Sequence, residues 1–456
     1  MMITKNKQSF WKMLPVIFAL AWPTMLEQLM QTAVQYIDTA MVGSLGTAAT
    51  AAVGSTTTVN WLINITMSSL SIGFLASIAQ ARGAKNYDRA AKTSAQAVLC
   101  ALFIGILYTV LTLTLSGMVP VWMQVDPSVQ QLAAEYFFIL YLPMLPRAAT
   151  VFFGTVLRAA GDTKTPMRVG VIINIVNVVL NFLLIYPTRK IWTITMPGMG
   201  WGVHGAAIAS AVAFVIGGIC MTVALWKHPD ISPKGQSMKP DWGILKPCLK
   251  VAIPNMLQGF STSLGYVTFA SMINALGEIA TAATTIANTV ESAFYIPGFG
   301  MQTAASTLSG NALGANDRQR MKDLTRMMLI LEVALMFLSG GLLFIFAPTL
   351  VRIFSDHPQV IQLCVLVLRM VALSEPIFGI SIIIQGILQG VGKTVTPFIF
   401  NVIGMWGVRI TGTFICTQLL HMGMVSAWAC MIAHNVVLCI LLTTHFIRGK
   451  WNAPNH

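Results

Sequence analysis

The 456-residue chain is 55% hydrophobic and only 9% charged, with a mean hydropathy of +0.73. Soluble domains usually carry about 25% charged residues, so this composition excludes a string of ordinary soluble domains. The formal net charge of +13 would fit a nucleic-acid-binding protein, but the placement of the basic residues argues against that class, as described below.

Twelve apolar segments follow one another along the chain, each long enough to cross about 30 Å of hydrocarbon. They lie at 14–37, 53–80, 94–117, 131–156, 167–187, 201–226, 248–274, 282–313, 327–347, 361–388, 397–420 and 424–446. Because lipid cannot pair with backbone polar groups, continuous runs of this length predict helices. Five prolines fall within these segments and predict bends; they are Pro23, Pro143, Pro254, Pro297 and Pro376.

The basic residues alternate between the connecting segments. One set of loops, together with both chain ends, holds 22 of the 28 lysines and arginines, whereas the opposite loops hold only Arg189, Lys190 and Arg352. Cytoplasmic loops are enriched in basic residues, so this pattern predicts a multi-pass protein of the plasma (cytoplasmic) membrane with both termini in the cytoplasm. It also explains the net charge without a nucleic-acid partner.

The chain repeats itself at a distance of 231 residues. Without a gap, this shift aligns Gly83-Ala84 with Gly314-Ala315, and residues 157–166 with 388–397, where the shared pattern is Leu-x-x-x-Gly-x-Thr-x-Thr-Pro. Each half contains six predicted spans. We therefore predict an all-α membrane protein with twelve transmembrane helices in two pseudo-symmetric six-helix bundles. The predicted parts are an amino-terminal lobe at 1–226, a cytoplasmic linker at 227–250 and a carboxy-terminal lobe at 251–456. Such a duplication is typical of transporters with a substrate path between the halves.

Polar side chains inside the first-half spans mark a candidate site, because ionisable groups in hydrocarbon are costly. Glu27, Gln31, Gln35 and Asp38 share one face of the first span, and Asn174, Asn177 and Asn181 share one face of the fifth. The oxygens of Asp38, Asn177 and Asn181 suit a small cation such as Na⁺, and Asp38 could instead bind a proton. We expect Gln31 to support them. A purely structural ladder of hydrogen bonds between helices is the alternative.

The second half carries its acids at different positions. Asp38 aligns with Phe269, while Glu291, Glu332 and Glu375 lie in the eighth, ninth and tenth spans. Glu291, Glu375 and Arg409 are the second-lobe site candidates. The alternative is a structural ion pair between Arg409 and either Glu291 or Glu375.

These motifs resemble the multidrug and toxic compound extrusion (MATE) family over about residues 13–446. The resemblance rests on Pro23, Gln31, the stretch Asp38 to Gly46, the Gly-Ala pairs and the repeated Thr-Pro motif. It implies alternating-access export of lipophilic, often cationic organic compounds in exchange for Na⁺ or H⁺. It also places the first-helix acid at Asp38 and the polar pair at Asn177 and Asn181. Some archaeal members carry aspartate at the position of Asn181. NorM-like members carry acids at two positions that are Thr262 and Phe378 in this chain. The resemblance therefore does not extend to a second-lobe cation site of that kind.

Two rival functions remain open at this stage. A lipid or lipid-linked oligosaccharide flippase of the same superfamily would need a strongly cationic cavity, and the spans offer only Arg147, Arg369 and Arg409. An intramembrane enzyme would need a motif such as HExxH, and the seven histidines show no such spacing. We therefore expect a transporter rather than an enzyme, acting as a monomer among membrane lipids, with a coupling ion but no cofactor.

Overall fold

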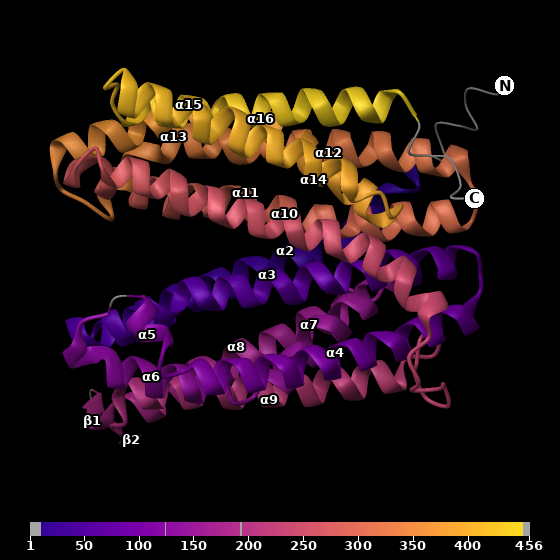
Figure 1. Cartoon of the computed structure of the whole chain (residues 1–456), viewed down its shortest axis with the longest axis horizontal. Helices are drawn as coiled ribbons and strands as arrows, with labels where there is room; N and C mark the ends of the chain where they lie inside the picture. The colour runs from indigo at the N-terminus through magenta and orange to yellow at the C-terminus, as the bar shows by residue number, and fades with distance from the viewer. Residues whose placement is uncertain (1–10, 124, 192–193, 450–456) are drawn as a thin grey trace. The chain divides into compact units, whose positions relative to one another are not determined.

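The computed structural model describes residues 11–123, 125–191 and 194–449 (Figure 1). Within them, twelve long helical segments coincide with the twelve predicted spans. They are α2 (Leu14–Gly43), α3 (Thr47–Gly83), α4 (Tyr87–Leu115), the pair α6 (Pro127–Tyr141) and α7 (Met144–Ala159), α8 (Lys164–Ile185), α9 (Gly202–Lys227), α10 (Trp242–Asn274), α11 (Glu278–Gly314), α12 (Arg318–Arg352), α13 (Pro358–Gly390), a composite helix at 395–419, and α16 (Met424–Ile447). The twelve-helix fold class is confirmed. The chain ends lie outside the described residues, so their cytoplasmic location stays a prediction.

Nine of these segments are apolar enough to span a membrane by length and composition alone, if α6 and α7 count as one bent span and only described residues are considered. The other three, α2, α10 and α11, have 30, 33 and 37 residues, so they are long enough to span.

Three irregular elements interrupt the pattern. Helices α6 and α7 meet at 51° around Pro143, which confirms the bend predicted there. The eleventh span is a mixture of α14 (Val395–Val402), η1 (Ile403–Ile410), α15 (Thr411–Phe414) and η2 (Ile415–Leu419), in which η1 and η2 are π-helical. A hairpin of β1 (Pro187–Ile191) and β2 (Ile194–Met199) joins α8 to α9. Neither the π-helices nor the hairpin was predicted from the sequence. One further short helix, α5 (Val119–Trp122), precedes α6.

Side-chain caps explain where helices α6 and α12 begin. Asp126 precedes α6 and accepts hydrogen bonds from the Ser128 hydroxyl and, at 2.9 Å, from the Ser128 backbone N–H. These bonds lower the pKa of Asp126. Asp317 caps α12 in the same way, accepting from the Arg320 N–H at 2.8 Å. Such caps satisfy backbone donors that have no partner within the helix.

The internal repeat is visible in the helix boundaries and in the turns. Both ends of α3 recur 231 residues later as the ends of α11, and the first residues of α4 and α8 recur as those of α12 and α14. Turn residues with positive φ recur at the same distance: Gly46 (111°) with Gly277 (107°), Lys85 (57°) with Asn316 (53°), and Gly161 (84°) with Gly392 (80°). The repeat predicted from the sequence is therefore present in these helix boundaries and turns.

The chain folds into two compact units. Unit 1 comprises the described parts of 1–28, 75–86 and 247–456, and unit 2 comprises 29–74 and 87–246. The core of unit 1 includes Phe269, Met405 and Trp428, and a second cluster in unit 1 joins Ile17 to α11, α12 and α13. Unit 2 packs Phe74 against Phe152, with ring centroids 6.2 Å apart. Unit 2 ends within the predicted 227–250 linker, and the lobe boundaries themselves stay a prediction.

Candidate functional site

Asp38, Asn177 and Asn181 come together in unit 2. Asp38 lies near the end of α2 and is half-buried, whereas Asn177 and Asn181 lie one turn apart on α8 and are 6% and 1% exposed. The Asn181 Nδ2 donates to Asp38 Oδ1 at 2.6 Å and to Asn177 Oδ1 at 3.1 Å. Two polar faces that the sequence placed on separate helices therefore meet at one carboxylate.

A fourth member of this site is Ser210 on α9. The Asn177 Nδ2 donates to the Ser210 Oγ at 2.9 Å, which ties α8 to α9 beside Asp38. Ser210 could not be predicted from the sequence, because a single serine in a helix rich in alanine and glycine carries no recognisable pattern. The structure alone shows that it orients an asparagine of the site.

The amide of Asn177 has two orientations with different consequences for Asp38. In one, its oxygen lies 2.8 Å from Asp38 Oδ1, an approach of two acceptors that becomes a hydrogen bond only if Asp38 carries a proton. In the other, its nitrogen donates to Asp38 Oδ1 at 2.8 Å and to Oδ2 at 3.1 Å, while its oxygen accepts from Ser210 at 2.9 Å. The second orientation suits an ionised carboxylate, because both asparagines then donate to it.

One oxygen at this site has no partner. The Asn181 Oδ1 is buried and accepts no hydrogen bond from any described residue. A buried carbonyl oxygen without a donor costs roughly 1–3 kcal/mol, so such atoms usually mark a bound water, ion or functional role. Carboxylate and amide oxygens are the hard ligands that small cations prefer, but here Asn181 turns its nitrogen, not its oxygen, toward Asp38 and Asn177.

Gln31 does not join this cluster in the described structure. It is exposed on α2, and no hydrogen bond in the described part of the chain links it to Asp38. Its supporting role stays a prediction.

A buried arginine occupies the same unit. Arg147 on α7 is 4% exposed and donates through Nη2 to the side-chain oxygens of Asn60 and, at 3.0 Å, Asn64. Its guanidinium lies 5.5 Å from the Tyr141 ring centroid and 4.7 Å from that of Phe214. The cation is therefore held by amide oxygens and aromatic faces.

The second-lobe candidates are all buried in unit 1: Glu291 on α11, Glu375 on α13 and Arg409 on η1. Among the described residues, however, no ion pair joins Arg409 to either glutamate. Arg409 instead lies 4.7 Å and 4.1 Å from the ring centroids of Tyr266 and Phe269. The ion pair considered as a structural alternative is therefore not formed in this part of the chain.

The positions at which NorM-like proteins carry acids are occupied by neutral contacts. Thr262 donates to Asn401 Oδ1 at 2.8 Å, and the ring of Phe378 lies 6.1 Å from that of Tyr295, edge to face. The amide pairs Gln258–Gln385 and Gln389–Asn255 continue this neutral ladder through unit 1, at 2.8 Å and 3.0 Å.

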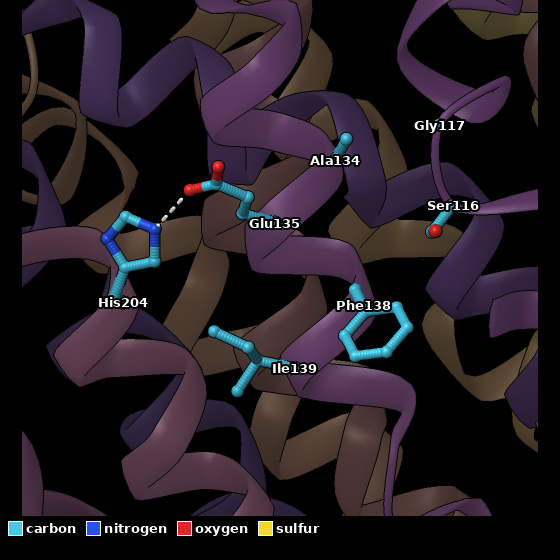
Figure 2. Close-up of a pocket in the computed structure, with 7 residues that line it drawn as sticks. All are labelled: Ser116, Gly117, Ala134, Glu135, Phe138, Ile139 and His204. Carbon is cyan, nitrogen blue, oxygen red and sulfur yellow. Dashed lines mark hydrogen bonds and ion pairs between the residues drawn. The ribbon is translucent and has the colours of Figure 1, made fainter.

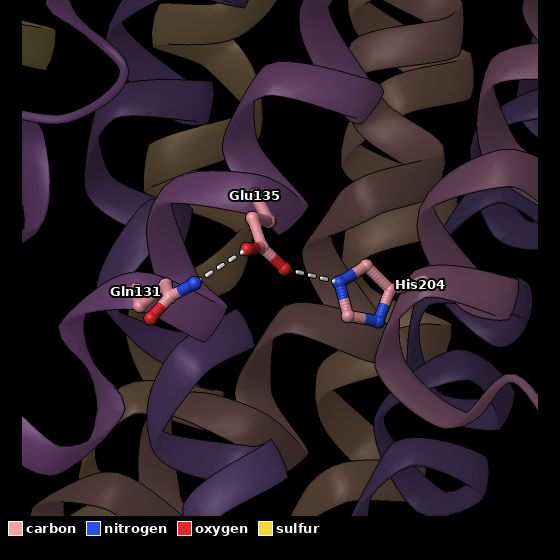
Figure 3. Close-up of polar contacts among 3 residues, drawn as sticks. All are labelled: Gln131, Glu135 and His204. Atoms are coloured by element: carbon pink, nitrogen blue, oxygen red, sulfur yellow. Dashed lines mark hydrogen bonds and ion pairs between the residues drawn. The ribbon is translucent and has the colours of Figure 1, made fainter.

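A surface pocket of about 420 Å³ lies elsewhere in unit 2 (Figure 2). Its lining includes Glu135 on α6 and His204 on α9, whose carboxylate and imidazole are 2.6 Å apart. Gln131 donates to the other Glu135 oxygen at 3.1 Å (Figure 3). Both members of the ion pair are well exposed, so water screens it and it contributes at most about 1 kcal/mol to stability. We treat it as a surface contact between α6 and α9.

Comparison with known proteins places these features in context. The MatE family model matches the chain twice, at residues 23–183 and 254–415. A probable multidrug resistance protein NorM from Thermotoga maritima is 28% identical over 435 residues, covering 95% of this chain and 92% of the relative.

Solved structures show the same fold. An outward-facing multidrug resistance MATE family transporter of the MOP superfamily has a TM-score of 0.88 at 21% identity, and 95% of each chain is covered. A MOP superfamily transporter from Pyrococcus furiosus has a TM-score of 0.86 at 23% identity, again over 95% of each chain, and is described as having a binding pocket of reversed polarity.

Proposed function

The chain belongs to the MatE family of membrane transporters, and from this premise we propose that it exports lipophilic, often cationic organic compounds in exchange for a sodium ion or a proton. The observation that carries the proposal is Asp38, held by Asn181 and Asn177 beside the unpaired Asn181 oxygen. We place the protein in the plasma membrane, as a monomer with both termini in the cytoplasm.

In this mechanism Asp38 binds the coupling ion, and the hydrogen bonds of Asn177 and Asn181 to Asp38 change when the ion binds. A proton on Asp38 favours the orientation in which the Asn177 oxygen faces the carboxyl, and its loss favours the orientation in which both asparagines donate. A sodium ion would be held by Asp38 and the two amide oxygens. Either ion changes the contacts between α2 and α8, and coupling requires such a difference between conformational states.

Charge within unit 2 supports cationic cargo over the flippase alternative. A flippase for lipid-linked pyrophosphate would need arginines free to bind anionic groups. Arg147 is already bound to Asn60 and Asn64, and in unit 1 Arg409 stacks on two rings.

The test is dye efflux from proteoliposomes with imposed ion gradients. We expect ethidium to be exported against its gradient when a sodium or a proton gradient is applied separately, and Asp38→Asn to reduce this uphill transport by roughly tenfold or more, the scale of a typical coupling free energy. Passive, downhill dye movement should change less, because the substitution removes the ion site and leaves the path.

Asp88→Asn is the matched control. Asp88 is an exposed carboxylate that pairs with Lys92 at 2.7 Å at the start of α4, and its loss should leave efflux unchanged. Uphill efflux by Asp38→Asn at the rate of the unchanged protein would refute the proposal. So would efflux that responds to neither gradient.

A further inference from the structure

Unit 1 contains a second group of buried ionisable side chains that the Asp38 mechanism does not use. Glu332, Glu375 and Glu291 are 0%, 2% and 9% exposed, and the nearby cation is Arg409 at 2%. Of the three carboxyl groups, that of Glu291 is close enough to the Arg409 guanidinium for opposite charges to attract. Arg409 also stacks on Tyr266 and Phe269, and no described carboxylate pairs with it. If all three glutamates were ionised, buried negative charge would remain without a compensating cation.

Glu332 sits in a slot made by glycines. On α12 it faces Gly298 of α11 and Gly379 of α13. A methyl group on Gly298 would lie 2.7 Å from the Glu332 Oε1, and one on Gly379 would lie 3.4 Å from the same atom and 3.1 Å from its Cγ. Neither oxygen of this carboxyl has a hydrogen-bond partner among the described residues. The slot fits the side chain but supplies no donor to a carboxylate.

Glu375 lies at the same interface between α12 and α13. It precedes Gly379 by one turn, and its Cβ would be 3.3 Å from a methyl group on Gly340 of α12. Its Oε2 is also without a partner. Both carboxyl groups are thus buried at one interface with oxygens that no donor satisfies, so two negative charges there would be costly.

The groups around this pair do not supply a compensating charge. Glu291 on α11 interacts electrostatically with Glu375, and a negative charge on Glu291 would add repulsion rather than compensate it. His434 on α16 lies beside Gly404 near Arg409, and neither of its nitrogens has a partner. Arg369, on α13 itself, is exposed and lies over the Phe344 ring.

We propose that Glu332 and Glu375 form a proton-binding site in unit 1, separate from Asp38. The carboxyls hold protons while the glycine slot is closed, and they release protons when movement of α12 against α13 admits water. The site rests on the proposed transport function, because only a transport cycle opens the slot. It implies that protons are exchanged in unit 1 whichever ion Asp38 binds.

The first experiment measures proton release on substrate binding. Purified protein in weakly buffered detergent, with a pH-indicator dye, is mixed with tetraphenylphosphonium, a lipophilic cation. We expect the protein to release protons, and Glu332→Gln/Glu375→Gln to remove a part of this release that Asp38→Asn leaves intact. Glu135→Gln, which alters the exposed pair with His204, is the matched control and should release the normal number.

Infrared difference spectroscopy provides a readout that does not depend on the double variant folding. The unchanged protein should show the carbonyl stretch of protonated carboxylic acids at neutral pH. Each single variant, Glu332→Gln or Glu375→Gln, should lose part of this band. Gly379→Ala, which crowds Glu332 without removing a carboxyl, should shift the band rather than lower it.

The outcomes separate this site from the Asp38 mechanism. Normal proton release by the double variant, or an unchanged carbonyl band in both single variants, overturns the unit 1 site. If Asp38→Asn still abolishes uphill efflux in that case, the proposed antiport stands without the unit 1 proton site. Conversely, loss of the band in the glutamate variants together with normal efflux by Asp38→Asn supports the unit 1 site and refutes the role of Asp38.

Discussion

Arg147 is a buried cation whose contacts in the described structure are neutral. Its guanidinium donates to Asn60 and Asn64 and lies between the rings of Tyr141 and Phe214. Arg147→Ala would leave amide oxygens short of donors and open a void between the rings. We expect it to lower the stability of the protein by about 3 kcal/mol, measured as thermal unfolding in detergent.

Arg369 provides the comparison for this prediction. It also lies over an aromatic ring, with 5.2 Å between its guanidinium carbon and the Phe344 centroid, but it is exposed. Arg369→Ala should change stability by about 0.5 kcal/mol or less. Equal shifts for the two variants would mean that the asparagine contacts contribute nothing.

For individual residues, the spacing of polar side chains along single helices predicted part of the Asp38 site. Asp38, Asn177 and Asn181 could be identified because each lies on a polar face of an apolar helix, and the structure brings all three together. Ser210 could not be identified, since its role depends on which helix packs against α8. The ion pair considered for Arg409 failed for a similar reason, because only the packed structure shows that Tyr266 and Phe269 take its place.

Helices α3 and α11 meet at their ends through two repeat-related glycines. A methyl group on Gly83 would overlap the backbone oxygen of Asn311, and one on Gly314 would overlap that of Gln80. This contact lies within unit 1 and explains why the Gly-Ala pair occurs in both halves. Gly83→Ala or Gly314→Ala should force the helices apart and cost about 1–3 kcal/mol, measured by thermal unfolding.

Gly43 at the end of α2 tests whether the effect comes from contact or from backbone preference. No atom lies within 4 Å of a methyl group placed there. Gly43→Ala should therefore be close to neutral or slightly stabilising. A loss of stability at Gly43 as large as that at Gly83 would contradict the packing explanation.

The boundaries of the long helices could largely be predicted from hydropathy. The π-helical turns and the β1–β2 hairpin could not. The long apolar runs predicted the helices because lipid permits few alternatives, and Pro143 predicted the break between α6 and α7. The π-helical η1 and η2 carry no proline or charge pattern that distinguishes them from α-helix. The β1–β2 hairpin contains Pro187 and Gly198, which read equally well as a loop.

The first half of the chain contributes to both units of the molecule. The start of α2 and the end of α3 belong to unit 1, where Thr24 donates to the Gly300 carbonyl at 3.1 Å and Gln80 to that of Gly390 at 3.0 Å. In unit 2, Gln96 donates to the Lys239 carbonyl at 2.9 Å. The first two bonds cross the predicted linker in sequence and the third ends within it, so the halves should associate without a covalent connection.

Cutting the chain in the linker tests this expectation. We expect fragments 1–234 and 235–456, co-expressed with a tag on one of them, to purify together, because the first fragment carries surfaces that complete unit 1. Gln80→Ala with Gln96→Ala should weaken the association by removing three of the cross-fragment hydrogen bonds, since Gln96 also accepts one from the Asp241 N–H. Recovery of the tagged fragment alone from the unaltered pair would show that the connection itself holds the halves together.

The duplication predicted the fold of the whole molecule well, but it did not predict where each half places its charges. Phe269 occupies the position equivalent to Asp38 and is buried in the core of unit 1, while the unit 1 acids lie on other helices. Sequence comparison between the halves identifies the shared scaffold. It cannot identify residues that one half acquired alone.

The π-helical turns of the eleventh span have a consequence for this divergence. A ring closed from residue i to i+5 holds one more residue than an α-helical ring, so each π turn carries the residues after it further around the helix axis. α8 and α14 begin 231 residues apart, but after Ile403 the two sister helices no longer present equivalent positions to their neighbours. Val178 in α8 is only partly buried, whereas its counterpart Arg409 is buried against two rings. A few widened turns thus let one copy of a repeated bundle show its neighbours a new set of side chains, while the glycine turn that leads into the helix keeps its place at Gly161 and Gly392.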